Sequence, residues 1–188
     1  NRSKAPEIQA ASIEAMHDWI ESIRNFPKPV IAAVEGAAAG AGFSLALACD
    51  FVVAAADAFF AMSYSRVALS PDGGASYHLM SALPRQLVTE ILMCGDRLGA
   101  NRLNDLGIVN QIAPSGEALA KALELAERLN ALAPNILASN KELINRAQHS
   151  SLNEQLAEER KQFVRNLHHA NAGIGIDAFL AKQAPKFV

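Results

Sequence analysis

The 188-residue sequence is 51% hydrophobic and 19% charged, with a formal net charge of −2 at pH 7. This apolar share is sufficient for the core of one globular domain and excludes an intrinsically disordered chain. The near-neutral charge balance gives no electrostatic reason to expect a nucleic-acid partner. The longest run without a charged residue, residues 36–49, is too short for a membrane span. We therefore expect a cytoplasmic protein that binds neither nucleic acid nor membranes.

The first part of the chain alternates between helices and short apolar strands. Apolar residues recur at helical spacing over residues 6–23, and Pro27 and Pro29 end that helix. The β-branched run Val30–Val34 predicts a buried strand, and a glycine-rich turn over residues 36–42 follows it. A helix is then predicted over residues 43–49, and strands over residues 51–54 and 58–61. Strand, turn, helix and strand in this order form a βαβ unit, which indicates an α/β core.

After Pro71 the pattern becomes predominantly helical. The spacing of Ser151 and Glu154 is typical of a capping box, which predicts that a helix begins there. Helices are predicted over residues 76–83, 85–93, 102–106, 117–132, 135–147, 152–167 and 174–182, with one late strand over residues 108–112. We therefore divide the chain into an α/β core, residues 1–115, and a helical region, residues 116–188.

The cysteines and histidines give no sign of a disulfide or a metal site. Cys49 and Cys94 each lie within an apolar stretch. Free cysteine is among the most buried residue types, so both are predicted to be buried free thiols. None of the five histidines pairs with Cys, Asp or Glu at a metal-ligand spacing.

The glycine-rich turn is the first candidate for a binding site. It follows a strand and opens a helix, so free backbone N–H groups and the positive end of the helix dipole meet there. A dinucleotide site is disfavoured because a third small residue and a suitably placed acid are lacking, and a phosphate loop because no Gly-Lys-Ser/Thr follows. Ser44 resembles the serine of a nucleophile elbow whose last glycine is replaced, and tight strand–helix packing is a further alternative. We favour an oxyanion-binding turn.

The segment Ser70–Gly74, which reads Ser-Pro-Asp-Gly-Gly, is the second candidate. Pro-Asp-Gly is common turn chemistry, so Asp72 would also fit a turn or a helix cap without any further role. However, the neighbouring residues Val67–Leu69 and Tyr77 are apolar or aromatic. Apolar surroundings suit a carboxyl group to proton transfer, and Asp72 is therefore a candidate general acid or base.

Five segments, residues 28–36, 38–42, 45–50, 70–74 and 177–182, carry a family resemblance. In this order and spacing they resemble the crotonase (enoyl-CoA hydratase/isomerase) superfamily. The resemblance implies an α/β fold: a crotonase-type ββα spiral core, followed by a helical C-terminal trimerisation region. Members of this family carry a β-rich segment before the position of Lys28. Because the sequence begins with Asn1 rather than Met, we expect the N-terminal part of the spiral to be missing from it.

The resemblance also implies an oxyanion site on the glycine turn. The N–H that would hold the oxygen of an acyl-CoA thioester maps to Ala41, between Gly40 and Gly42. Its partner N–H would lie in the missing segment. Two backbone donors of this kind stabilise an enolate as negative charge develops on the thioester oxygen.

The resemblance further distinguishes between reactions. Hydratases of the family use two glutamates, and this chain has Ser44 and Tyr64 at those positions. Neither side chain can act as a carboxylate base, so hydration is not expected. The Δ3,Δ2-enoyl-CoA isomerases and the ring-epoxide isomerase of phenylacetate breakdown place an acid at the position of Asp72. The chain is closest to that branch, which implies an acyl-CoA isomerase of fatty-acid or phenylacetate metabolism with Asp72 as its acid/base.

Further residues and partners follow from the same resemblance. Phe179 and Lys182 match positions that contact coenzyme A, usually across a subunit boundary. Coenzyme A enters as part of the substrate, so no cofactor and no metal is expected, and the protein is expected to be a homotrimer or a dimer of trimers. The residues expected to shape the pocket, with a hydroxyl that orients the acid, are Ser44, Tyr64, Leu69 and Tyr77.

Three alternatives remain open at the level of the sequence. The first is another crotonase reaction, such as enoyl-CoA hydration, ring-epoxide isomerisation or thioester hydrolysis. The second is a non-catalytic acyl-CoA-binding homologue, since one fold can support many functions. The third is a serine hydrolase built on Ser44, for which no ordered Asp and His complete a triad downstream.

Overall fold

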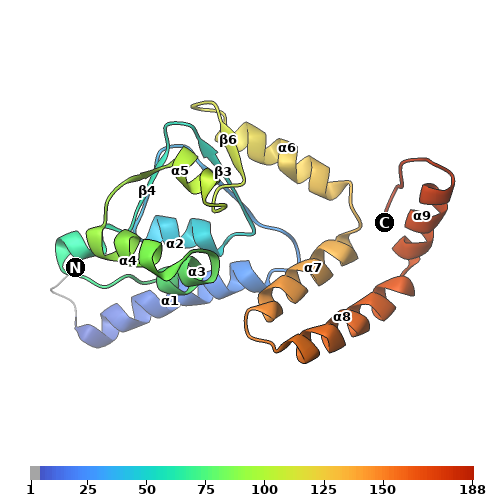
Figure 1. Ribbon diagram of the computed structural model, residues 1–188, viewed down its shortest axis with the longest axis horizontal. Helices are drawn as coiled ribbons and strands as arrows, with labels where there is room; N and C mark the ends of the chain where they lie inside the picture. The colour runs from blue at the N-terminus through green and yellow to red at the C-terminus, as the bar shows by residue number, and fades with distance from the viewer. Residues whose placement is uncertain (1–4) are drawn as a thin grey trace. The chain divides into compact units, whose positions relative to one another are not determined.

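The computed structural model describes residues 5–188, which form two compact units (Figure 1). Of the described residues, the first unit contains 5–26 and 30–122, and the second contains 27–29 and 123–188. The chain therefore leaves the first unit within helix α6 (Ala118–Asn130). A trimerisation role for residues 116–188 stays a prediction.

The strands of the first unit form two three-stranded sheets. One sheet has the order β1 (Ile31–Val34), β3 (Phe51–Ala55) and β6 (Gln111–Ala113), with parallel pairing throughout. In the other, β4 (Phe59–Ala61) pairs parallel with β2 (Ala37–Ala39) and antiparallel with β5 (Leu98–Gly99). Consecutive strands thus enter alternate sheets, and helix α2 (Ala41–Ala48) connects β2 to β3. This repetition of two strands and a helix is the ββα arrangement predicted from the sequence.

Helix α1 (Pro6–Asn25) matches the helix predicted at the front of the chain. It begins with Pro6 in its first turn, where a missing N–H costs nothing. It ends at Asn25 because Phe26 precedes a proline, and a residue in that position is restricted to extended conformations. Within the first unit α1 contacts α2, and Ile20 is buried.

The other helices of the first unit are short. They are the 3₁₀ helix η1 (Ser63–Val67), α3 (Ala75–Ala82), α4 (Arg85–Cys94) and α5 (Ala100–Asp105). Figure 1 shows α1, α2, α3 and α4 gathered in the same part of this unit. Helices α3 and α4 confirm the two predicted over residues 76–83 and 85–93, to within one residue at each end.

Three predicted elements were wrong in detail. The last helix runs over Ala170–Leu180 instead of residues 174–182. The turn predicted over residues 36–42 contains strand β2, in which Ala38 is buried and its neighbours are exposed. The late strand predicted over residues 108–112 is displaced to Gln111–Ala113, because Ile108 and Val109 donate their N–H groups to the Leu103 carbonyl at 2.9 and 3.1 Å. These two residues therefore complete the C-terminal turn of α5 instead of joining a sheet.

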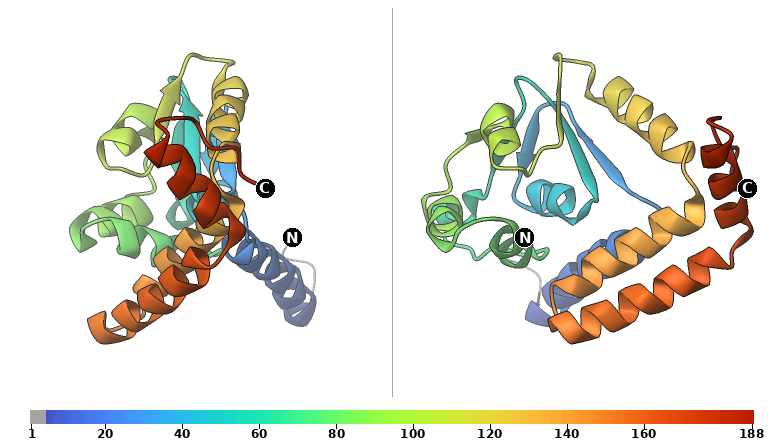
Figure 2. Two further views of the ribbon diagram at one scale, coloured as in Figure 1. Left: turned by 90° about the vertical axis from the view of Figure 1, so that its right-hand side faces the viewer. Right: turned by 45° about the vertical axis from the view of Figure 1, so that its right-hand side comes forward.

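The second unit is helical. After α6 come α7 (Pro134–Ala147), α8 (Leu152–Leu167) and α9 (Ala170–Leu180), and Figure 2 shows α7 and α8 side by side. The predicted capping box is confirmed: Ser151 Oγ accepts the Glu154 N–H and Glu154 accepts the Ser151 N–H. Throughout residues 5–188, every helix is too short or too polar to cross a membrane.

The core of the first unit lies where α2 meets the strands. Phe43 of α2 and Phe60 of β4 are fully buried, and their ring centroids are 5.0 Å apart. The prediction that both cysteines are buried was wrong. Cys49 is half-buried at the end of α2, and Cys94 is exposed because it ends α4, so both are free thiols with some access to solvent.

Candidate functional site

The glycine turn is fixed by the backbone of β4. Gly40 has φ 54° and ψ −120°, a conformation that favours glycine, and its N–H donates to the Ala61 carbonyl at 2.9 Å. The Gly40 carbonyl in turn accepts the N–H groups of Phe43 and Ser44 at 3.0 and 3.1 Å. The turn therefore holds the start of α2 in a defined orientation.

The N–H groups of Ala41 and Gly42 are available at this helix start. They belong to the first turn of α2, whose N–H groups have no intrahelical partner and lie at the positive end of the helix dipole. A Cβ atom placed on Gly42 would find nothing within 4 Å. The turn thus offers backbone donors beside open space, as an oxyanion-binding turn requires.

Asp72 is joined to this turn by two hydroxyl groups. The Tyr64 hydroxyl of η1 donates to Asp72 Oδ1. Ser44 Oγ donates to the backbone carbonyl of Asp72 at 2.9 Å and lies 3.4 Å from the Gly40 carbonyl. The structure therefore brings together four of the predicted site residues: Ala41, Ser44, Tyr64 and Asp72.

Gly73 determines how closely the Asp72 segment approaches α2. It has φ 62°, and an added Cβ atom would lie 2.6 Å from Met16 Cε and 2.9 Å from Ser44 Cβ. Only glycine fits between these side chains with that backbone conformation. Gly73 is therefore enclosed between Met16 of α1 and Ser44 of α2. No local sequence signal predicts this contribution of α1.

Ser44 and Tyr64 have different roles in this arrangement. Ser44 is fully buried and its hydroxyl donates to carbonyl groups, so it anchors the Asp72 segment and is not presented as a nucleophile. Burial raises the pKa of the Tyr64 hydroxyl above its ordinary value, and the hydrogen bond to the Asp72 carboxylate and its negative charge raise it further. Tyr64 is therefore a permanent hydrogen-bond donor at neutral pH.

The other two predicted pocket residues, Leu69 and Tyr77, have different surroundings. Leu69 is 63% exposed. Tyr77 lies on α3, where the Arg24 guanidinium carbon is 5.1 Å from its ring centroid and the His78 ring is 5.3 Å away. Burial, and secondarily the positive charge of Arg24, lowers the pKa of His78 to about 4, so this imidazole is neutral at pH 7. Arg24 and Tyr77 are far apart in the sequence, so no local pattern predicts their contact.

The predicted coenzyme A residues lie on the second unit. Phe179 is 81% exposed near the end of α9, and Lys182 follows the helix with φ 55°. Their role stays a prediction. Among residues 5–188, the His, Cys, Asp and Glu side chains form no group of three or more that could hold a metal ion.

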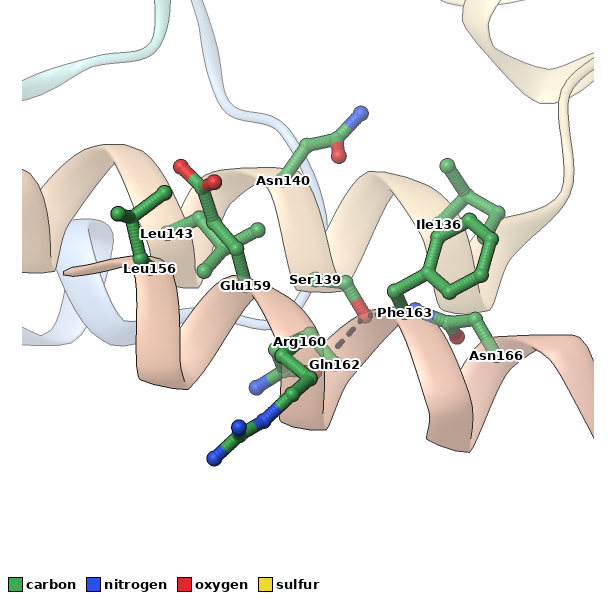
Figure 3. A pocket seen from close by; sticks show the side chains of 10 residues that line it. All are labelled: Ile136, Ser139, Asn140, Leu143, Leu156, Glu159, Arg160, Gln162, Phe163 and Asn166. Atoms are coloured by element: carbon green, nitrogen blue, oxygen red, sulfur yellow. Dashed lines mark hydrogen bonds between the residues drawn. The ribbon is translucent and has the colours of Figure 1, made fainter. Parts of the chain in front are cut away.

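The second unit also contains a groove of about 510 Å³ between α7 and α8 (Figure 3). Ile136 and Phe163 lie at one end and Leu143 and Leu156 at the other, while a Ser139–Gln162 hydrogen bond of 3.3 Å joins the helices between them. The remaining lining residues are Asn140, Glu159, Arg160 and Asn166. The groove is therefore mainly apolar at both ends.

Two features together, a ββα spiral and backbone donors beside a carboxylate, are typical of crotonase-type proteins. The model of the enoyl-CoA hydratase/isomerase family matches residues 1–188. The chain belongs to this family, which confirms the superfamily resemblance and the fold predicted from the sequence.

Individual relatives agree with this family. Carnitinyl-CoA dehydratase of Escherichia coli K12 is 37% identical over 175 residues, which cover 88% of this chain and 65% of that protein. A crystal structure of an enoyl-CoA hydratase from Polaromonas sp. JS666 is 64% identical and superposes with a TM-score of 0.98, covering all of this chain (100%) and 73% of that one. One from Bacillus anthracis has a TM-score of 0.94 at 27% identity, covering 99% and 72%. The chain thus spans 65% of the length of the curated relative, and the isomerase branch stays a prediction.

Proposed function

We propose that the protein is an acyl-CoA isomerase that uses Asp72 as its one acid/base. Removing a proton from the carbon α to the thioester moves an electron pair onto the thioester oxygen. Returning that proton at the γ carbon shifts the double bond into conjugation with the carbonyl. One carboxyl group is sufficient because the proton it takes is the proton it gives back.

The observation that carries this proposal is the junction between Asp72 and the first turn of α2. Tyr64 occupies Asp72 Oδ1, whereas Oδ2 has no hydrogen-bond partner within residues 5–188 and is free for the substrate. The Ala41 N–H and the helix dipole stabilise the negative charge of the enolate. The Ser44 hydrogen bond keeps the acid and the donor in one rigid group.

A hydratase or dehydratase is the second candidate, and the names of the relatives favour it. Hydratases of this family use two glutamates to hold and activate the water, and this chain has Ser44 and Tyr64 at those positions. Ser44 is fully buried and donates to a carbonyl, and the pKa of Tyr64 is raised, so neither accepts a proton from water near neutral pH. The geometry therefore supports isomerisation better than hydration.

The remaining parts of the proposal concern partners. The substrate is an acyl-CoA thioester, with Phe179 and Lys182 contacting coenzyme A and no separate cofactor. The protein works as a homotrimer or dimer of trimers in the cytoplasm. The exposed apolar side chains of the second unit, such as Ile144 at 67% and Phe163 at 68%, support association with other copies.

The test is Asp72→Asn in the full-length protein, assayed with 3-enoyl-, 2-enoyl- and epoxyphenylacetyl-CoA. This change keeps the shape and removes the base, so we expect isomerisation to fall by about 10²- to 10⁴-fold. Asp57→Asn is the matched control, because Asp57 is an exposed acid in the turn between β3 and β4. An Asp72→Asn rate within a few-fold of wild type would refute the assignment, as would a wild type that hydrates 2-enoyl-CoA faster than it isomerises 3-enoyl-CoA.

A further inference from the structure

Several contacts fix the backbone of η1, the short helix that carries Tyr64. Met62, which precedes η1, is fully buried. At the other end of η1, Ala68 adopts a left-handed conformation with φ 56° and ψ 39°, which returns the Leu69 N–H to the Tyr64 carbonyl at 3.0 Å. A non-glycine residue in this region is uncommon and needs support from its surroundings.

Helix α4 supplies part of that support. It ends at Gly95, where an added Cβ atom would lie 2.9 Å from Ser65 Oγ and 3.2 Å from the Met62 carbonyl oxygen. Arg66 donates through Nε to the Gly95 carbonyl at 3.1 Å and forms an ion pair with Asp96. The η1 segment is therefore clamped against the end of α4.

The Tyr64 side chain then lies between the two halves of the site. An added Cβ atom on Gly40 would lie 3.2 Å from both Cζ and Oη of Tyr64, so the end of the ring rests on the glycine turn. The same hydroxyl donates to Asp72 Oδ1. One side chain thus touches both the turn that carries the backbone donors and the carboxylate that carries the proton.

We infer that Tyr64 is a positioning residue that fixes the separation between the Asp72 carboxylate and the donors of the glycine turn. Its hydroxyl is hydrogen-bonded to Oδ1, so Oδ2 is the oxygen that exchanges the proton with the substrate. The inference rests on the proposed function of Asp72 and adds a group that does not itself touch the reacting carbon atoms. Because burial and the neighbouring carboxylate keep the hydroxyl protonated, Tyr64 remains a hydrogen-bond donor to Oδ1 at neutral pH.

The experiment that tests this inference is the substitution Tyr64→Phe, which keeps the ring against Gly40 and removes only the hydroxyl. A hydrogen bond to a charged group corresponds to roughly a 10- to 100-fold effect, so we expect kcat to fall by about that factor while KM changes by less than about 3-fold. In the Asp72→Asn background, Tyr64→Phe should have almost no further effect, because Tyr64 acts through Asp72.

A second measurement does not depend on turnover. The tyrosinate absorbance of wild type and Asp72→Asn is titrated with base, and Tyr64 should ionise at lower pH in the variant because the negative charge beside it is gone. Equal titrations, or a Tyr64→Phe enzyme with wild-type kcat, would overturn the inference while leaving Asp72 as the acid. Full activity of Asp72→Asn would instead refute the proposed function.

Discussion

The two glycines that flank Ala41 do different things in the turn. Gly40 has a positive φ and faces the Tyr64 ring, with only 3.2 Å between an added Cβ atom and the nearest ring carbon. Gly42 faces open space. The first is therefore required by the fold, and the second leaves room for whatever approaches the backbone donors.

This difference predicts opposite effects of the same substitution. Gly40→Ala should destabilise the protein by about 1 kcal/mol or more, because it strains the backbone and displaces Tyr64. Gly42→Ala should leave stability unchanged or slightly higher, but should raise KM for the thioester because a methyl group enters the approach path. Urea unfolding and steady-state kinetics on both variants provide the check. Each variant is the control for the other, and equal unfolding midpoints would contradict the expectation.

The residues of the candidate site can be predicted from the sequence, whereas the hydrogen bonds between them cannot. Asp72 and the glycine turn stand out because Pro-Asp-Gly and Gly-Ala-Gly are recognisable locally, and a hydroxyl was expected to orient the acid. Of the three hydroxyl side chains predicted near the acid, Tyr64 binds the carboxylate and Ser44 binds the backbone. That distinction depends on how η1 and α2 pack, which no local pattern contains.

At the scale of elements, helix α6 is capped by a residue far from it in the sequence. Glu35, directly after β1, accepts the N–H of Ala118 at 2.6 Å through Oε1 and the N–H of Gly116 at 3.0 Å through Oε2. Both donors lie at the start of α6, where N–H groups need partners and negative charge is favourable. Glu35 thus replaces the local N-cap residue that most helices use.

Removing this distant cap should loosen the start of α6. We expect Glu35→Ala to lower the free energy of unfolding by about 1 kcal/mol, as loss of a helix cap does elsewhere. Glu90→Ala, an exposed glutamate on α4, provides the comparison. Amide hydrogen exchange should show faster exchange at Gly116 and Ala118 in the first variant only. Unchanged protection at those two amides would disprove the capping role.

The elements themselves divide into those with and without a local signal. Helix α8 was predicted with its bounds because Ser151 and Glu154 form a recognisable capping box. Strand β2 was missed because Ala37–Ala39 has low strand propensity, and it is a strand only through pairing with β4. The Glu35 cap likewise has no local signal, because it depends on the position of the end of β1 relative to the start of α6 in the folded chain.

At the scale of the whole molecule, several large apolar side chains of the second unit are exposed to solvent. Leu152 is 72% exposed, Phe163 68% and Ile144 67%, and Phe163 lines the groove between α7 and α8. Apolar surface of this kind is typical of protein–protein contacts. It is the physical basis for the proposed association of several copies.

A charge placed in this surface should therefore reduce association. For the full-length protein we expect light scattering to give a mass of three or six chains, and Phe163→Asp to give a smaller species. Asn153→Asp is the matched control, because it adds the same charge to an exposed polar position of the same helix. A monomeric wild type, or a Phe163→Asp protein of unchanged mass, would count against the proposed assembly.

The placement of Tyr64 and Tyr77 has a practical consequence. They are the two tyrosines in this sequence, and they lie on η1 and α3, the helices that flank the Asp72 segment on either side. Fluorotyrosine incorporated into this part of the chain would give one ¹⁹F resonance before the acid and one after it. The Tyr64 resonance would sense the carboxylate directly, whereas the Tyr77 resonance would sense the Arg24 and His78 side of α3. The two tyrosines thus provide one spectroscopic reporter on each side of Asp72 in the sequence.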